Sequence, residues 1–217
     1  MFLTQAALNP ARRGTGRLLA SPQALHAAVL AGFPPDSSGP TTDGRVLWRI
    51  DREHPHLWLY VVSPERPDLT HLIEQAGWPT TATWDTRDYT PLLGRVAAGQ
   101  HYAFRLTANP VKQSREPDHA GKRLGHVTAD QQRDWLLGRT DNHGFRIPEP
   151  TSGEPNVIVS ERIKRSFRRN GNTVTLVTAR YDGRLEVTDA DRFRHALTHG
   201  VGRAKGYGCG LLTVAAR

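Results

Sequence analysis

Residues 200–212 read GVGRAKGYGCGLL, a segment with five glycines and two cationic side chains. Glycine has no β-carbon, so a phosphate group can come close to main-chain N–H groups, and Arg203 and Lys205 would add positive charge. The alternative is a tight helix-to-strand connection in which glycine only satisfies turn geometry. The phosphate-binding hypothesis has six candidate residues, Gly202, Arg203, Lys205, Gly206, Gly208 and Gly210.

The segment does not fit the two common nucleotide-binding motifs. A P-loop needs a glycine, four residues and then Gly-Lys-Ser/Thr, whereas Gly121-Lys122 is followed by arginine and lacks the first glycine. The dinucleotide-binding motif needs a following helix and an acidic residue about 20 positions on, but only seven residues follow Gly210. A polynucleotide backbone is therefore the favoured phosphate.

A second basic stretch, RIKRSFRR at residues 162–169, supports a nucleic-acid partner. Because side chains alternate in a strand, its cations would lie on both faces, so the strand cannot be buried in a sheet and should project as a ribbon. Such a ribbon could contact several phosphates of a duplex, although a solvated edge strand guarded by charge has the same pattern. Its five cations are Arg162, Lys164, Arg165, Arg168 and Arg169.

The overall composition agrees with a polyanionic partner. The 217 residues carry 29 Lys and Arg against 21 Asp and Glu, a net charge of +8. The single cysteine, Cys209, excludes an internal disulfide and a multi-cysteine metal site, and suits a reducing cytoplasm. Neither a signal peptide nor an apolar stretch long enough to cross a bilayer is found, so we expect a soluble cytoplasmic protein with no membrane partner.

The amino-terminal half predicts one ferredoxin-like unit. Apolar alternation indicates strands, apolar residues at helical spacing indicate helices, and Ser21-Pro22 is a typical helix start. The resulting order, βαββαβ, is that of the split βαβ unit, with HYAFRLTA as its last strand, shared with or repeated in a second unit at the boundary. The predicted elements are a strand at 2–8, a helix at 22–30, strands at 45–51 and 56–63, a helix at 68–77 and a strand at 101–108.

A second, looser unit follows. Thr128 and Gln131 form a capping-box pattern before a helix that carries Trp135, and Asn170-Gly171 is a strong hairpin signal. The predicted fold class is therefore α+β, with tandem ferredoxin-like domains at residues 1–98 and 99–217. The flanking elements are strands at 156–169, 172–183 and 184–189, a helix at 190–199 and a strand at 210–216.

At this point four stretches resemble a known family. The glycine-rich segment is similar to the signature of the RAMP superfamily, specifically of the CRISPR precursor-RNA endoribonucleases of the type I-E Cascade complex. The other three stretches are MFLTQAALNP, LHAAVLAGFP and YAFRLTANPVK, and together the four run from the first residues to the last. No single stretch is specific, but their combination in this order is.

The resemblance implies tandem ferredoxin-like domains that bind the stem-loop of a CRISPR repeat and cut at its 3′ base. Cleavage would need no metal ion or other cofactor: the 2′-hydroxyl attacks the adjacent phosphate and leaves a 2′,3′-cyclic phosphate and a 5′-hydroxyl. The family's catalytic histidine falls on His26, and a histidine with its ordinary pKa of about 6.5 can act as acid or base near neutrality. The product crRNA would stay bound, with the protein as a Cascade subunit.

Two positions depart from the family pattern. Gln23 stands where a tyrosine is frequent, one helical turn before His26; its amide can hydrogen-bond a phosphate oxygen but cannot act as a phenolic acid. Arg203 stands where proline is frequent and adds a cation. Lys112, Arg203 and Lys205 are the candidates for stabilising charge that develops on the phosphate during cleavage.

Two other functions compete with this hypothesis. In a non-catalytic RNA-binding subunit, Gln23 would mark the loss of an active site. In a metal-dependent nuclease, His54 and His56 would be ligands, but no carboxylate cluster accompanies them, so we expect no metal site.

Overall fold

The computed structural model describes residues 1–35, 39–53, 56–79, 84–113, 123–149, 153–169 and 171–216. The chain forms two compact units. The first comprises Met1–Arg95, Thr198–Gly200 and Lys205–Leu211, and the second comprises Val96–Leu197, Val201–Ala204 and Leu212–Arg217. The carboxyl-terminal segment thus contributes to both, and the domain limits 1–98 and 99–217 stay a prediction.

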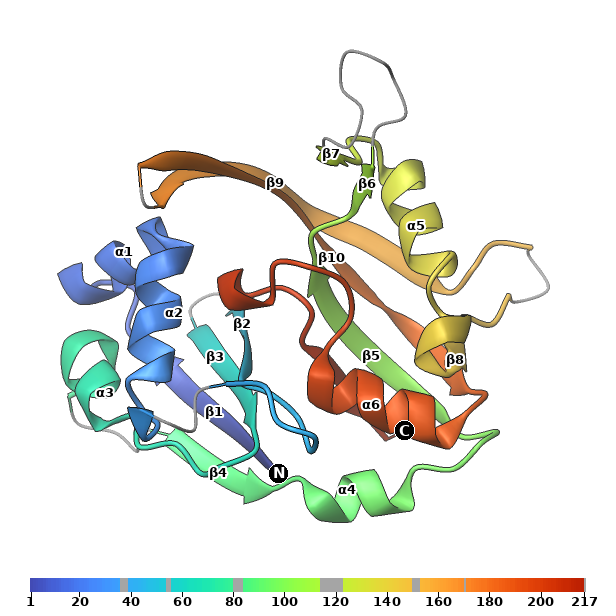
Figure 1. The fold of residues 1–217 in the computed structure, drawn as a ribbon, viewed down its shortest axis with the longest axis horizontal. Coiled ribbons are helices and arrows are strands. Elements are labelled where there is room, and N and C mark those ends of the chain that lie inside the picture. The colour runs from blue at the N-terminus through green and yellow to red at the C-terminus, as the bar shows by residue number, and fades with distance from the viewer. Residues whose placement is uncertain are drawn as a thin grey trace. The chain divides into compact units, whose positions relative to one another are not determined.

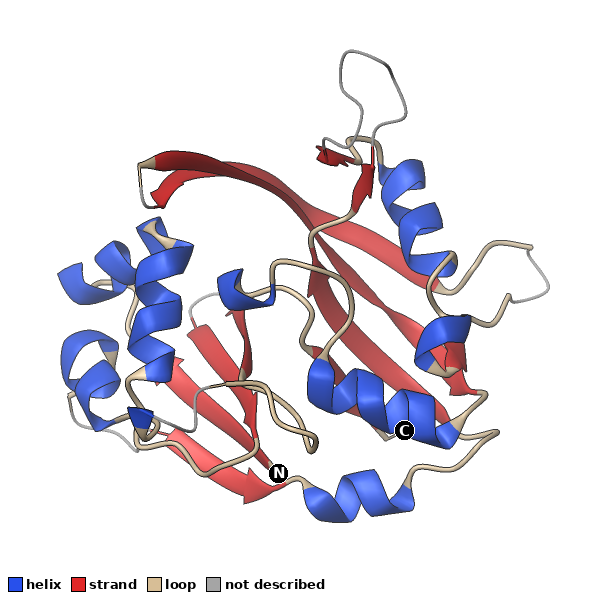
Figure 2. Cartoon of the chain, in the orientation of Figure 1, coloured by secondary structure: helices blue, strands red, loops and turns tan. Residues whose placement is uncertain are grey.

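The first unit is a four-stranded antiparallel sheet in the order β2-β3-β1-β4, with helices packed on one face (Figures 1 and 2). This strand order is that of a ferredoxin-like fold. Apolar side chains of the sheet, such as Leu8 and Leu59, share a core with Leu25 and Leu72 of the helices. The elements are β1 (Phe2–Leu8), α1 (Arg13–Ala20), α2 (Pro22–Leu30), β2 (Leu47–Glu53), β3 (His56–Ser63), α3 (Thr70–Ala76), β4 (Trp84–Asp88) and α4 (Thr90–Arg95).

The closing strand of this unit corrects the sequence prediction. HYAFRLTA at 101–108 is the first strand of the second unit, and β4 closes the first. β4 has the sequence WDTRD, without apolar alternation, because only Thr86 of its five side chains is buried. Its place beside β1 rests on main-chain pairing and on a 2.9 Å hydrogen bond between the hydroxyls of Thr4 and Thr86.

The second unit repeats the order βαββαβ with additions. Its sheet runs β11-β5-β10, and both β9 and β8 pair with the remaining edge of β10. The tandem ferredoxin-like α+β prediction is thereby confirmed, and so is the Thr128–Gln131 capping box at the start of α5. The elements are β5 (His101–Ala108), β6 (Val111–Gln113), β7 (Arg123–Gly125), α5 (Ala129–Leu137), η3 (Asp141–His143), β8 (Phe145–Arg146), β9 (Val157–Arg169), β10 (Asn172–Val187), α6 (Ala190–His199) and β11 (Leu212–Ala215).

The β9–β10 hairpin projects from this sheet as the charge pattern predicts. Its pairing runs from Arg169↔Asn172 to Val157↔Gly183, whereas β5 pairs with β10 only from Ala179 onward. In the described ranges, residues 172–178 pair with no strand except β9, and Figure 1 shows the two strands as a long curved ribbon. Gly171 has a φ of +81°, as a tight hairpin turn requires; Asn170 lies outside the described residues.

None of the helices in the described part of the chain has the length and apolar composition needed to cross a membrane.

Candidate functional site

His26 lies on α2, a helix that begins as its sequence predicts. The Ser21 hydroxyl accepts a hydrogen bond from Ala24 N at 3.2 Å, and Pro22 occupies the first turn. Leu25 and Val29 turn into the core, which leaves His26 half-buried at the edge of the buried face. His26 is therefore held in place by a packed helix while its side chain stays partly accessible.

Trp48 of β2 determines which ring nitrogen of His26 is available. Its indole Nε1–H donates a hydrogen bond to His26 Nδ1 at 3.2 Å, and Trp48 itself is only 3 % exposed. An indole N–H can only donate, so Nδ1 must accept and the neutral ring carries its proton on Nε2. Nε2 is therefore the nitrogen that can serve chemistry.

The glycine-rich segment meets this nitrogen at Gly206, within the short η4 helix (Lys205–Tyr207). A β-carbon at position 206 would lie 3.1 Å from His26 Nε2, closer than side chains normally pack. Glycine at this position therefore lets the main chain pass beside the histidine. The first unit thus brings together His26 and Gly206, two of the residues that the sequence singles out.

Gly208 lies against Trp48, the residue that is hydrogen-bonded to His26. It is buried with a φ of +79°, and a β-carbon there would lie 2.6 Å from Cζ3 of Trp48. A larger residue would displace the indole that holds His26. Gly210 is also buried and has a φ of +90°. Turn geometry and close packing thus explain these two glycines, while their predicted role in RNA binding stays a prediction.

The cations of the segment differ in their surroundings. Lys205 is half-buried, and burial, with a smaller effect of the nearby Arg45 charge, lowers the pKa of its amine. Arg203 is exposed and belongs to the second unit, as does Lys112, an exposed residue of β6. Gln23 is half-buried on α2, one turn before His26.

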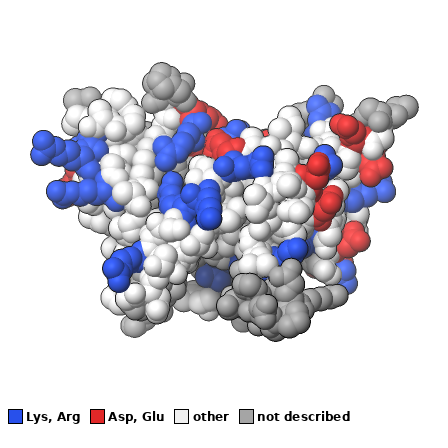
Figure 3. Space-filling view, turned by 90° about the horizontal axis from the view of Figure 1, so that it is seen from above, with Lys and Arg blue, Asp and Glu red and all other residues white. Residues whose placement is uncertain are grey.

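The basic hairpin presents its cations unequally. Arg162 is held against α5, because its guanidinium donates to Gln132 Oε1 at 3.1 Å and also to the main-chain oxygen of Val127. Lys164 and Arg168 are exposed and Arg165 is half-buried, while the side chain of Arg169 lies outside the described residues. Figure 3 shows Lys and Arg side chains in several groups on one face, with Asp and Glu side chains beside some of them and uncharged surface between others.

Within the described ranges, no three His, Cys, Asp or Glu side chains lie close enough together to hold a metal ion. His54 lies outside these ranges. The prediction of a metal-independent reaction therefore remains one that only an activity measurement can test.

A family model described as "CRISPR associated protein" matches residues 1–216. The chain belongs to this family. Its sequence is 31% identical, over 99% of its length and 100% of the relative's, to the CRISPR-associated endoribonuclease Cse3 of Thermus thermophilus. The resemblance drawn from the four sequence stretches is therefore confirmed.

A solved structure and one further relative extend the match. A solved structure of Thermus thermophilus Cse3 bound to an RNA representing a pre-cleavage complex has a TM-score of 0.79 and 30% identity, and covers 99% of this chain and 98% of that one. The Cascade subunit CasE of Escherichia coli is 26% identical over 77% of this CRISPR-associated protein and 94% of its own length. The chain is thus similar to an endoribonuclease of this family in both sequence and fold.

Sequence patterns missed Trp48 as part of the site. It alternates with Val46 and Ile50 along a strand, which is typical of a core residue, and it is indeed buried. Only the fold shows that its one polar atom reaches a histidine 22 positions earlier in the chain.

Proposed function

We propose that this CRISPR-associated protein is an endoribonuclease that cuts the stem-loop of a CRISPR repeat in precursor RNA. The support is a match over essentially the whole chain to an endoribonuclease whose structure holds a pre-cleavage RNA. The observation that carries the proposal is the position of His26, whose Nε2 faces the main chain at Gly206. Because residue 206 is glycine, no side chain covers the reactive nitrogen from that side.

The reaction we propose is a transesterification without a metal ion. The 2′-oxygen forms a bond to the adjacent phosphorus while the bond from phosphorus to the 5′-oxygen breaks. The 2′-hydroxyl loses its proton and the departing 5′-oxygen gains one, so the products are a 2′,3′-cyclic phosphate and a 5′-hydroxyl. We assign His26 to the departing oxygen, because its Nε2–H can donate a hydrogen bond to that oxygen. Full transfer of this proton requires a second proton on Nδ1, in place of the hydrogen bond from Trp48, so that the ring is left neutral when the 5′-oxygen takes the Nε2 proton.

The remaining candidates act on charge. Gln23 can donate its amide N–H to a non-bridging phosphate oxygen from the same face of α2 as His26. Lys205, Arg203 and Lys112 are cations that would stabilise the additional negative charge of the transition state. Burial of its amine lowers the pKa of Lys205, and a bound phosphate would compensate the cost of that burial.

The β9–β10 hairpin would hold the RNA stem. The major groove of an A-form helix hides its base edges, so the cations Lys164, Arg165, Arg168 and Arg169 would contact mainly phosphates. Arg162 is already bonded to α5 and would hold the base of the hairpin in place. The glycine-rich segment, at Gly202 and Gly206, would approach the RNA backbone near the cut.

The partner and location that we propose follow from this function. The Escherichia coli relative is named a Cascade subunit, so we propose that this protein retains its crRNA product and assembles with other Cascade subunits. The cytoplasm is the proposed compartment, in agreement with the single reduced cysteine.

The deciding experiment is cleavage of the host's repeat RNA in excess chelator, with a single 2′-deoxy substitution upstream of the cut as the matched control. Cleavage of the normal RNA alone supports attack by the 2′-hydroxyl. Loss of cleavage in chelator would instead indicate a metal-dependent nuclease. Binding of both RNAs with cleavage of neither would indicate a non-catalytic RNA-holding subunit, and Gln23 would be the first residue to replace.

The role of His26 is tested by His26→Ala. Because general acid–base groups contribute about 10²- to 10⁴-fold to rate, the variant should lose that much cleavage while its affinity for the stem-loop stays within about twofold. His101→Ala, which replaces an exposed histidine on β5, is the control. A wild-type rate in His26→Ala would refute the assignment.

A further inference from the structure

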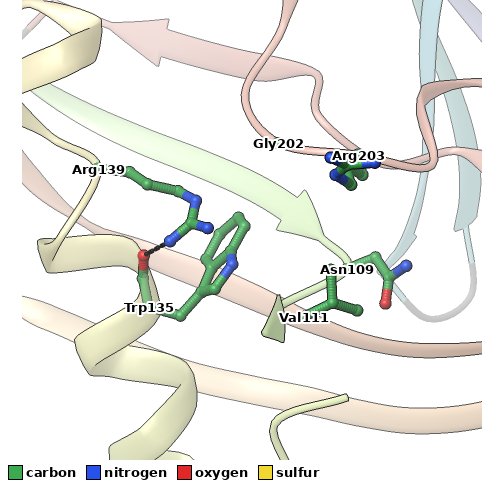
Figure 4. A pocket seen from close by; sticks show the side chains of 6 residues that line it. All are labelled: Asn109, Val111, Trp135, Arg139, Gly202 and Arg203. Carbon is green, nitrogen blue, oxygen red and sulfur yellow. Dashed lines mark hydrogen bonds between the residues drawn. The ribbon is translucent and has the colours of Figure 1, made fainter. Parts of the chain in front are cut away.

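The second unit contains a pocket that the sequence patterns do not predict. Its volume is about 190 Å³, whereas one water occupies about 30 Å³ in the liquid, so it has room for a small polar ligand. Figure 4 shows its lining, with the Trp135 and Arg139 side chains side by side. The lining residues are Asn109, Val111, Trp135, Arg139, Gly202 and Arg203, all of them in the second unit.

Trp135 contributes an unused hydrogen-bond donor. It is only 4 % exposed, and its buried Nε1–H has no hydrogen-bond partner among the described residues. A buried donor without an acceptor costs about 1–3 kcal/mol, so native proteins rarely leave one unpaired. An acceptor supplied by a ligand in the pocket would remove that cost.

The indole is also held firmly in place. The Tyr181 ring stacks on it with the ring centroids 6.2 Å apart, and the Arg139 guanidinium lies 4.3 Å from its centroid. A β-carbon on Gly202 would lie 2.9 Å from the indole, so the main chain there packs directly on the ring. The pocket wall is therefore preorganised by contacts on several sides.

Two guanidinium groups line the pocket without a counter-ion. Within the described ranges neither Arg139 nor Arg203 forms an ion pair, and none of the six lining residues is acidic. Arg139 donates to Trp135 O at 2.9 Å, which fixes the plane of its guanidinium and leaves other N–H groups unused. Burial, together with the Arg203 charge, lowers the pKa of Arg139, as expected where a cation lacks an anion.

Asn109 presents a third donor. Its Oδ1 already accepts a hydrogen bond from Val177 N at 3.3 Å, so the amide NH₂ is the part of the side chain that remains for a ligand. The side chains around the pocket thus offer an indole N–H, an amide and two guanidinium groups. Such a set of donors and positive charges matches an anion rich in acceptor oxygens.

We propose that this pocket binds a phosphate group, and that the phosphate belongs to the RNA strand held by the protein. That the pocket binds a phosphate is argued from its hydrogen-bond donors and cations alone. That this phosphate belongs to RNA rests on the proposed function. Two of the four family-like stretches meet here, since Asn109 comes from YAFRLTANPVK and Arg203 from the glycine-rich segment. A phosphate in this pocket would be bound by residues of the second unit alone, whereas His26 belongs to the first unit.

The phosphate chemistry is tested on the full-length protein with inorganic phosphate as the probe, measured as a shift in thermal midpoint against chloride of equal ionic strength. Wild type should be stabilised and Arg139→Gln should lose most of the shift. Arg133→Gln, on the same helix but ion-paired with Asp130 outside the pocket, is the matched control and should keep it. Arg203→Gln, an exposed residue, repeats the test should Arg139→Gln fold poorly.

The source of the phosphate is tested by binding of the 2′-deoxy repeat stem-loop as a function of salt. Each lost phosphate contact reduces the slope of log affinity against log salt by about 0.7 to 0.9, and affinity near 0.1 M salt should fall about tenfold. We expect both changes in Arg139→Gln and neither in Arg133→Gln. A phosphate-dependent thermal shift with an unchanged salt slope would assign the pocket to a free phosphate and overturn the RNA source.

An absent thermal shift together with an unchanged slope would overturn the pocket altogether. Failure of the proposed function looks different, because wild type itself would then neither bind nor cut the repeat RNA. The two hypotheses can therefore fail separately.

Discussion

Trp48 shows what a single residue adds to a predicted active site. The type of residue 26 suggests acid–base chemistry, but only the hydrogen bond from Trp48 shows which nitrogen carries the proton. The sequence could not predict this bond, because it joins a strand and a helix through two side chains that each resemble ordinary core or surface residues. The same holds for Gly206 and Gly208. Each must be glycine because a side-chain ring lies against it, that of His26 from α2 or that of Trp48 from β2.

Trp48→Phe should therefore slow cleavage without changing RNA affinity. The substitution keeps an aromatic ring but removes the N–H, so the His26 proton is free to move to Nδ1, and the rate should fall up to about tenfold. Single-turnover cleavage measures the rate, and ¹⁵N NMR of the imidazole measures the tautomer. Trp58→Phe, on the neighbouring strand β3, is the control. An unchanged tautomer together with an unchanged rate would rule out the positioning role.

Lys205 makes a prediction about pH. Burial lowers the pKa of its amine in the folded state, so the unfolded chain holds this proton more tightly. Lys205→Met should therefore raise the free energy of unfolding at neutral pH and weaken RNA binding. As pH rises through the lowered pKa toward the ordinary lysine value of about 10.4, wild type loses the cost and the difference should shrink. Urea unfolding of wild type and Lys205→Met, at neutral pH and near the ordinary lysine pKa, measures the difference in free energy of unfolding. A difference that does not change with pH would contradict the prediction.

Secondary-structure elements were predictable where their own pattern is strong. The capping box of α5 and the β9–β10 hairpin follow from local residues, whereas α1 does not, since Gly14 and Gly16 are poor helix formers. Packing stabilises α1 instead: Leu18 is buried and the Thr15 hydroxyl donates to Ala76 O at 3.0 Å. A β-carbon on Gly14 would lie 2.1 Å from Gln75 O, so glycine permits this close approach to α3.

The exposed cations of the hairpin should contribute to RNA binding but not to the stability of the fold. Because Lys164 and Arg168 are exposed, the double substitution Lys164→Gln, Arg168→Gln should reduce the salt slope by about 1.5 in log–log units and lower affinity at least about tenfold. Thermal stability and the cleavage rate of saturated enzyme should not change. Arg162→Gln provides the contrast, since loss of its bonds to α5 should lower stability as well.

An unchanged salt slope in the double variant would mean that these cations do not contact RNA and only keep an edge strand solvated. The same titration therefore distinguishes the two interpretations that the sequence leaves open for the basic strand.

At the scale of the whole molecule, element order predicted two units of one kind, and the strand orders agree. It did not predict that the carboxyl-terminal segment would be divided, with Thr198–Gly200 and Lys205–Leu211 in the first unit and the stretches between and after them in the second. The reason is physical: these memberships depend on contacts such as Gly208 with Trp48 and Gly202 with Trp135, which join residues far apart in the chain.

Cys209 gives a test of this division. It is fully buried in the first unit, and burial raises the pKa of its thiol to about 12. The native protein should therefore resist thiol reagents near neutral pH and react only as fast as the first unit opens. A variant that lacks residues 205–217 cannot serve as the control, because it has no Cys209. The control is the full-length protein in denaturant, in which Cys209 should react rapidly. Rapid labelling of the native protein would show that the segment detaches readily.

The interleaved carboxyl-terminal segment also has a consequence for biosynthesis. The first unit cannot be completed when the ribosome has made residue 95, because Gly206 and Gly208, which lie beside His26 and Trp48, are translated only later. A nascent or prematurely terminated chain would hold the histidine but lack the backbone that faces it. Nuclease activity would thus be withheld until the segment Lys205–Leu211 has been made and has packed into the first unit.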